Sequence, residues 1–176
     1  AGFLVPIVPT AILFDLAIGK PDVRPDATMG YAACAAASSD PVQQGTIGAG
    51  TGCRVGAMRG NEYAAKGGIG SASVDLGDGL VVAALMAVNA VGDVVEDDGR
   101  VIAGLRESPD SNTFVGMMNM MKIMARMVEM PAPAASTNTV VGVVATNAKL
   151  TKEETNKVAQ MAHDGLARAV RPAHTM

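Results

Sequence analysis

The run LVVAALMAV, residues 80–88, and the run TVVGVVAT, residues 139–146, decide the fold of this chain. Both are nearly continuous apolar stretches of strand length, which are typical of strands buried on both faces of a sheet. The dipeptide Asp78-Gly79 stands just before the first run and is a strong signal for a tight hairpin turn. We therefore predict two buried strands, with a hairpin turn ahead of the first.

Helical patterns alternate with these runs. Residues 27–39 are rich in alanine, the residue with the highest helix propensity. Residues 117–130 hold seven of the twelve methionines near helical spacing, which predicts a loosely packed amphipathic helix. Thr151 and Glu154 form a capping box that opens a third helix. Because helix-rich and strand-rich stretches alternate, we predict an α/β layered fold in a single domain over residues 1–176.

The other segments have weaker signals. Pro6 and Pro9 keep the residues before them extended, and residues 11–16 are expected to form a short strand. Residues 96–116 are predicted to be a polar link, and residues 131–136, PAPAAS, an exposed extended linker.

Composition excludes several classes of protein. The chain has 176 residues, 14 Lys plus Arg and 17 Asp plus Glu, a net charge of −3. With 49% hydrophobic and only 18% charged residues it is not a disordered chain, and it has no Lys/Arg run that would bind nucleic acid or an anionic membrane. No apolar stretch is long enough to cross a bilayer, and no signal peptide is visible. Two cysteines outside any C-x-x-C spacing fit a reducing cytoplasm, and Cys34, among alanines, is expected to be buried and inert.

Common cofactor and catalytic motifs are missing. The glycines of residues 45–52 do not form G-x-G-x-x-G, because Cys53 stands where the third glycine belongs, and no phosphate loop follows. His163 and His174 lack the neighbours of a metal site, and His163 is expected on the exposed side of its helix. We therefore expect no metal and no cofactor.

One junction could carry chemistry. Asn138-Thr139 lies between the predicted linker and the second apolar run. A Thr hydroxyl is a weak nucleophile unless a base lies beside it. If the bond before Thr139 is cut, the new α-amino group, with a pKa of about 8, can accept the proton of that hydroxyl. Spacing alone does not decide for this reading, because Thr often begins a strand.

A series of short sequence blocks bears on whether Thr139 is a nucleophile or an ordinary strand start. In chain order they are VPIVPTAILFDL (5–16), GTIGAGTG (45–52), KGGIGSAS (66–73), VNAVG (88–92), NT (138–139), VVATNA (143–148) and RPAHT (171–175). Together they resemble the self-processing family that includes L-aminopeptidase/D-esterase, β-peptidyl aminopeptidases and nylon-oligomer hydrolase. The resemblance covers most of the chain outside residues 106–135.

The resemblance implies an N-terminal-nucleophile-like hydrolase with an αββα sandwich, made as an inactive precursor that cleaves itself. Residues 1–138 would be the α piece without its N-terminal strands and residues 139–176 the start of the β piece, so the sequence is expected to be incomplete at both ends. The processed pieces would assemble as a homo-oligomer, and the substrates would be small peptides or β- or ω-amino acid amides, including nylon oligomers. No cofactor is implied.

The resemblance also implies residue roles. Asn138–Thr139 would be the bond that is cut, and Thr139 the nucleophile of both processing and turnover. Asn89 would donate its amide to the oxyanion, although by itself it reads as a side chain that caps a turn at a strand end. Three further residues are expected near the substrate: Phe14, Gly48 and Gly50.

The chain departs from the family pattern in three places. Ala57 stands where a Lys is common, and Arg54, Arg59 or Lys66 are the basic residues that could replace it. Phe14 stands where nylon-oligomer hydrolase has Tyr, and the acidic residues that follow the H-T block are absent because the sequence stops at Met176. Two other hypotheses therefore remain: a catalytically impaired member that acts in assembly or binding, and a small-molecule-binding α/β domain that uses the glycine loops.

Overall fold

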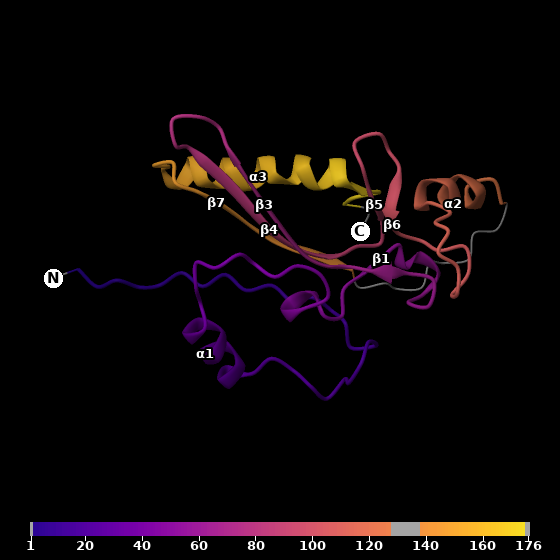
Figure 1. Ribbon diagram of the computed structural model, residues 1–176, viewed down its shortest axis with the longest axis horizontal. Coiled ribbons are helices and arrows are strands. Elements are labelled where there is room, and N and C mark those ends of the chain that lie inside the picture. The colour runs from indigo at the N-terminus through magenta and orange to yellow at the C-terminus, as the bar shows by residue number, and fades with distance from the viewer. Residues whose placement is uncertain (1, 128–137, 175–176) are drawn as a thin grey trace.

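A computed structural model describes residues 2–127 and 138–174 (Figure 1). Within these residues the chain forms three small antiparallel sheets and three α-helices, which confirms the predicted α/β class. None of the helices in this part of the chain is long and apolar enough to cross a membrane.

The central sheet consists of the two runs predicted from the sequence and one further strand. Its order is β3 (Gly68–Asp75), β4 (Val81–Asn89) and β7 (Thr139–Thr146). Asp78-Gly79 makes the predicted turn between β3 and β4, with φ of 51° and 76°, and the Leu80 N–H donates to the Gly77 carbonyl oxygen at 2.9 Å. Two consecutive positive φ values are what a type I′ hairpin turn requires.

The two faces of this sheet have different neighbours (Figure 1). Helix α3 (Lys152–Ala169) lies along one face, and the predicted capping box of Thr151 and Glu154 is present at its start. A small cavity of about 200 Å³ separates α3 from Met86 and Val140 on that face. The opposite face is turned toward the N-terminal segment and helix α1 (Ala27–Ala35).

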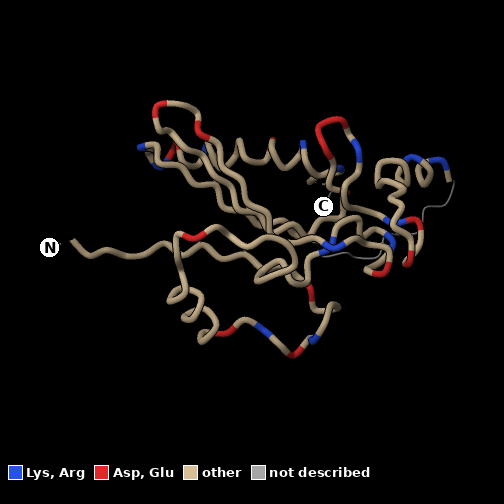
Figure 2. The backbone as a smooth tube through the Cα atoms, viewed as in Figure 1, with Lys and Arg blue, Asp and Glu red and all other residues tan. Residues whose placement is uncertain are grey.

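Smaller elements surround the end of the central sheet. They are the 3₁₀ turns η1 (Gly48–Gly50) and η2 (Ala57–Arg59), strands β1 (Arg54–Val55) and β2 (Ala65–Lys66), the sheet of β6 (Val101–Ala103), β5 (Asp93–Val95) and β8 (Val170–Arg171), and helix α2 (Met117–Met124). Val55, Ala90 and Val170 form a buried core between them. Figure 2 shows that the charged residues lie mainly on turns and helix surfaces, while the central strands are nearly free of charge.

A buried carboxylate fixes helix α2. Asp93 is 1% exposed and accepts hydrogen bonds from the backbone N–H groups of Leu105, at 2.8 Å, and Met117. Burial raises the pKa of Asp93, and the two backbone donors offset part of that rise. The predicted polar link of residues 96–116 is therefore wrong: it contains β6 and the fully buried Leu105.

Several other expectations need correction. Residues 11–16 form no strand, and the alanine-rich helix ends at Ala35 instead of Ser39. No residue of α1 is buried, so Cys34 is exposed, and Cys53 is the buried cysteine.

Burial and helix length also differ from prediction. The strands β4 and β7 are half-exposed over most of their length, because within the described residues no second sheet packs on the face opposite α3. The methionine-rich helix runs from Met117 to Met124, and the predicted linker of residues 131–136 lies outside the described residues.

Candidate active site

Several of the sequence blocks that carry the resemblance meet at one end of the central sheet, whereas VVATNA, residues 143–148, runs to the other end. Gly68, the first residue of β3, pairs with Val88 near the end of β4. On the other side of β4, Asn89 pairs with Thr139, the first residue of β7. Gly45, just before η1, forms an isolated β-bridge with Ile69 of β3 and so lies at the same end of the sheet.

Asn89 and Thr139 are direct partners in the antiparallel ladder between β4 and β7. Residues directly opposite each other in such a ladder have Cα atoms ~4.5–5.5 Å apart, and their side chains leave the same face of the sheet. The structure therefore brings the predicted nucleophile next to the predicted oxyanion donor. Asn138, on the other side of the predicted scissile bond, is half-buried, as is Thr139.

Two hydrogen bonds fix the orientation of the Asn89 carboxamide, which is 4% exposed. Its Oδ1 accepts from the Arg54 backbone N–H at 3.0 Å, and its Nδ2 donates to the Phe14 carbonyl oxygen at 3.4 Å. Because the Arg54 N–H needs an acceptor, the amide cannot flip without losing that bond. The Nδ2 group has two hydrogens, so one is left to donate to a further acceptor beside Thr139.

The glycines at this end permit close backbone packing. A Cβ on Gly50 would lie 2.7 Å from the Ile69 nitrogen, and a Cβ on Gly67 would overlap the Val88 carbonyl oxygen. Neither contact can be relieved by moving a flexible side chain. These glycines therefore hold the β1–β3 connection against the end of β4, beside Asn89.

A cavity of about 720 Å³ opens between the N-terminal segment and the central sheet. Ala87 and Val141 line it from the sheet. Ala87 lies two residues before Asn89 in β4, and Val141 lies two residues after Thr139 in β7. A step of two residues covers ~6.8 Å along a strand and keeps the side chains on the same face. The cavity therefore lies on the face of the sheet that carries the candidate site.

The residues expected near substrate differ in position. Gly48 lines the cavity, whereas Gly50 is buried in η1 and is not part of the cavity lining. The carbonyl of Phe14 contacts Asn89, but its side chain is 47% exposed and is not part of the cavity lining.

The three basic residues considered as replacements for the family lysine have different surroundings. Ala57 itself is buried in η2. The Arg59 guanidinium lies 4.0 Å from the centre of the Tyr63 ring, a cation–π contact, and Lys66 is exposed. Arg54 contacts Asn89 through its backbone, and its Nε is buried with no hydrogen-bond partner among the described residues. Arg54 is therefore the one of the three that directly contacts the candidate site.

The two histidines come together away from this site. The rings of His163 on α3 and His174 have centroids 5.1 Å apart. His163 is exposed, but it lines the small cavity between α3 and the central sheet and does not lie on the outer side of the helix, where it was expected. Within the described residues no three His, Cys, Asp or Glu side chains form a possible metal site.

Sequence reasoning missed one residue of the candidate site. Asp15 lines the cavity directly after Phe14. It stands in the quoted block VPIVPTAILFDL, so its place in that block was the available signal.

The chain is 41% identical to an uncharacterized aminopeptidase of Mycobacterium leprae over 99% of this chain and 47% of that protein, and 41% identical to one of Mycobacterium tuberculosis over 98% and 48%. It is 28% identical to the 6-aminohexanoate-oligomer endohydrolase of Paenarthrobacter ureafaciens over 96% and 46%. The chain thus spans about half the length of the curated relatives it matches.

The model of peptidase family S58 matches residues 1–176. This match and the named relatives confirm the resemblance inferred from the sequence blocks. The chain belongs to peptidase family S58.

Proposed function

We propose that this protein is a self-processing amide hydrolase whose nucleophile is Thr139. The observation that carries the proposal is the direct pairing of Thr139 with Asn89 at the end of the central sheet, beside a cavity on the same face. Family membership and relatives named as aminopeptidases and as an oligomer endohydrolase support the same reaction class.

Processing would use the Thr139 hydroxyl. Its oxygen attacks the carbonyl carbon of Asn138, the amide nitrogen of Thr139 leaves and takes a proton, and an ester joins Asn138 to the side chain of Thr139. Water then hydrolyses this ester, which yields a carboxylate on Asn138 and a free α-amine on Thr139. That amine is the base that the hydroxyl otherwise lacks.

Turnover repeats the same chemistry on a substrate amide. The Thr139 oxygen attacks the substrate carbonyl while its proton passes to the Thr139 amine. The negative charge on the carbonyl oxygen is stabilised by the Asn89 Nδ2 group, and the leaving amine takes the proton as the C–N bond breaks. Water hydrolyses the resulting ester and regenerates Thr139.

The substrate class and the assembly follow from the same family. We propose small peptides and β- or ω-amino acid amides, including nylon oligomers, as substrates, and a homo-oligomer of the processed pieces as the assembly. We also propose that the complete fold is an αββα sandwich, in which the cavity face of the central sheet meets the second sheet.

The experiment is hydrolysis of an aminoacyl p-nitroanilide by the purified protein and its variants. Thr139→Ala removes the nucleophilic hydroxyl and is expected to abolish hydrolysis, whereas Thr139→Ser keeps a hydroxyl and is expected to retain measurable activity. Thr146→Ala, at the other end of the same strand, is the matched control and keeps wild-type rates. Full activity in Thr139→Ala would exclude this nucleophile.

One observation favours a second candidate, a member of the family that binds small molecules without hydrolysing them. Ala57 is buried where the family commonly has a Lys, so a basic group of the reaction is missing at that position. In that case the wild-type protein binds the anilide with the same affinity as Thr139→Ala and neither hydrolyses it.

A further inference from the structure

The cavity above the central sheet has a single acidic group among its lining residues, Asp15. Asp15 is half-buried, and the residues that line the cavity from the sheet are the apolar Ala87 and Val141. A carboxylate in such surroundings loses part of its hydration, and a cationic partner is the usual compensation.

The backbone holds Asp15 close to the candidate site. The carbonyl of the preceding residue, Phe14, accepts the hydrogen bond from Asn89 Nδ2, and consecutive Cα atoms are ~3.8 Å apart. The Asp15 carbonyl accepts from the Ile18 N–H at 2.8 Å, which fixes the turn that follows.

The Asp15 side chain also packs against the backbone at Gly52. Gly52 packs so closely against it that a Cβ at Gly52 would overlap the Asp15 side chain. The charge of Asp15 also contributes, after burial, to the raised pKa of the Cys53 thiol. Asp15 is therefore a half-buried side chain that packs against the backbone at Gly52.

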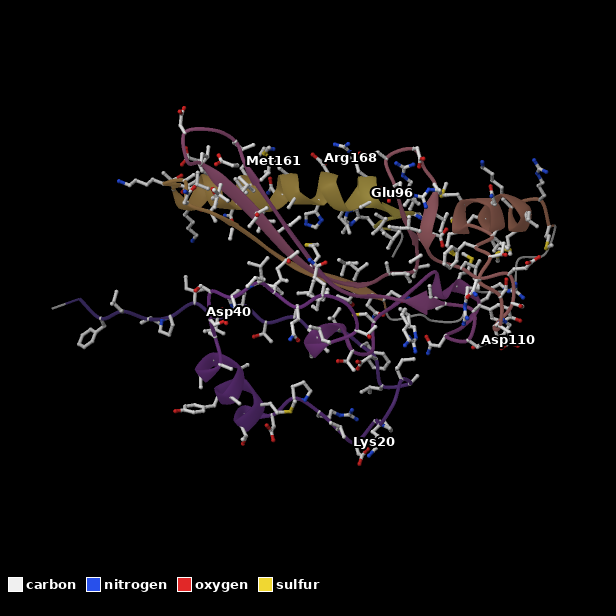
Figure 3. All side chains as sticks on the ribbon, in the orientation of Figure 1. Lys20, Asp40, Glu96, Asp110, Met161 and Arg168 are labelled. Carbon is white, nitrogen blue, oxygen red and sulfur yellow. The ribbon has the colours of Figure 1, made fainter. Side chains whose placement is uncertain are left out.

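No protein cation pairs with this carboxylate in the described residues. The ion pairs found there are Arg100–Glu96 and Arg168–Asp97, and no hydrogen bond involves the Asp15 side chain. Lys20 and Arg24 also line the cavity, and neither forms an ion pair with Asp15 in the described residues. Lys20 lies at the outer turn of the N-terminal segment, away from the sheet (Figure 3).

We propose that Asp15 binds the free ammonium group of the substrate. This inference rests on the proposed function, because it places the amine beside Asp15 when the substrate carbonyl lies between Thr139 and Asn89. The ligand class is an aminoacyl amide with an unblocked primary amine, and Asp15 selects it against the acylated form. A charge-assisted hydrogen bond of this kind is strong enough to set such a preference.

The test compares β-alanyl p-nitroanilide with its N-acetyl form. The wild-type protein is expected to prefer the free amine by about 10- to 100-fold in kcat/KM, the range that a hydrogen bond to a charged group supports. Asp15→Asn keeps the shape of the side chain and is expected to remove most of that preference. The loss should fall on KM for the free amine, with the acetylated substrate little changed.

Asp22→Asn is the matched control, because Asp22 is an exposed carboxylate of the same segment outside the cavity lining. It is expected to keep the wild-type preference. The inference is overturned if Asp15→Asn retains the full preference, or if it loses activity equally on both substrates.

Failure of the proposed function has a different signature. If the wild-type protein hydrolyses neither substrate, or if Thr139→Ala hydrolyses both at wild-type rates, the nucleophile is wrong. The affinities of the two anilides, measured by calorimetry, then test Asp15 alone. A preference for the free amine that Asp15→Asn removes supports the inference, and equal binding of both forms overturns it.

Discussion

Replacement of Asn89 by Asp tests the chemistry of the candidate site with the smallest change of shape. The aspartate keeps an oxygen in the place of Oδ1, so the bond from the Arg54 N–H at 3.0 Å can persist. The other oxygen replaces Nδ2, so the donor toward Phe14, at 3.4 Å, and toward the reacting oxygen is lost. Asn89→Asp therefore removes a donor and adds a buried negative charge.

The magnitude follows from these two changes. Loss of one oxyanion donor costs about 10²- to 10³-fold in kcat, or roughly 3–4 kcal/mol. The carbonyl oxygen of Phe14 and one oxygen of the new carboxylate then face each other, and residue 89 is only 4% exposed. This repulsion lowers the free energy of unfolding by about 1–3 kcal/mol. We expect kcat to fall by at least 100-fold while the protein stays folded.

The assay is hydrolysis of an aminoacyl p-nitroanilide, with the melting temperature measured in parallel. Asn147→Asp is the matched control, because Asn147 stands at the opposite end of the same sheet. It also accepts from a backbone N–H, that of Val81 at 2.9 Å, and donates to a backbone carbonyl, that of Gly79 at 2.7 Å. A kcat for Asn89→Asp within threefold of wild type would refute the oxyanion role, as would an equal loss in Asn147→Asp.

Three further changes test the fold. Gly67→Ala places a Cβ against the Val88 carbonyl and should lower the melting temperature strongly, whereas Gly70→Ala, with open space around its Cβ, should be tolerated. Asp93→Asn leaves one buried backbone N–H without an acceptor and should cost about 1–3 kcal/mol in urea unfolding near pH 4. Burial raises the pKa of Asp93 in the folded state, so the contribution of Asp93 to stability is complete below its unfolded-state pKa and is lost as the pH rises through its folded-state pKa. The difference in the free energy of unfolding between wild type and Asp93→Asn should therefore shrink over that pH range. A difference that stays constant with pH would contradict this. Thr151→Ala removes the capping box of α3 and should cost about 1 kcal/mol, and an unchanged unfolding midpoint would argue against it.

The sequence predicted correctly those features that depend on a few adjacent residues. Strand β7 has the predicted limits, residues 139–146, and the turn at Asp78 and the capping box of Thr151 are where the sequence puts them. Each depends on a few adjacent residues. The strand expected at residues 11–16 did not form, because its apolar residues have no partner strand within the described residues.

Long-range features could not be derived in the same way. Leu105 ends the run VIAGL, residues 101–105, which is too short to show a periodicity that marks it as core, yet Leu105 is fully buried and its N–H donates to Asp93. The pairing of Asn89 with Thr139 depends on strand register, which spacing along the chain does not determine. Family resemblance suggested both residues, and the structure supplied their proximity.

The central claim is that Thr139 becomes an N-terminal residue and acts through its own amine. Intact mass measurement of the purified, denatured protein tests it most directly. The account predicts two pieces, one ending at Asn138 and one beginning at Thr139 with a free α-amine, and a single uncut piece in Thr139→Ala. An uncut wild-type chain that hydrolyses aminoacyl anilides at full rate would contradict the account.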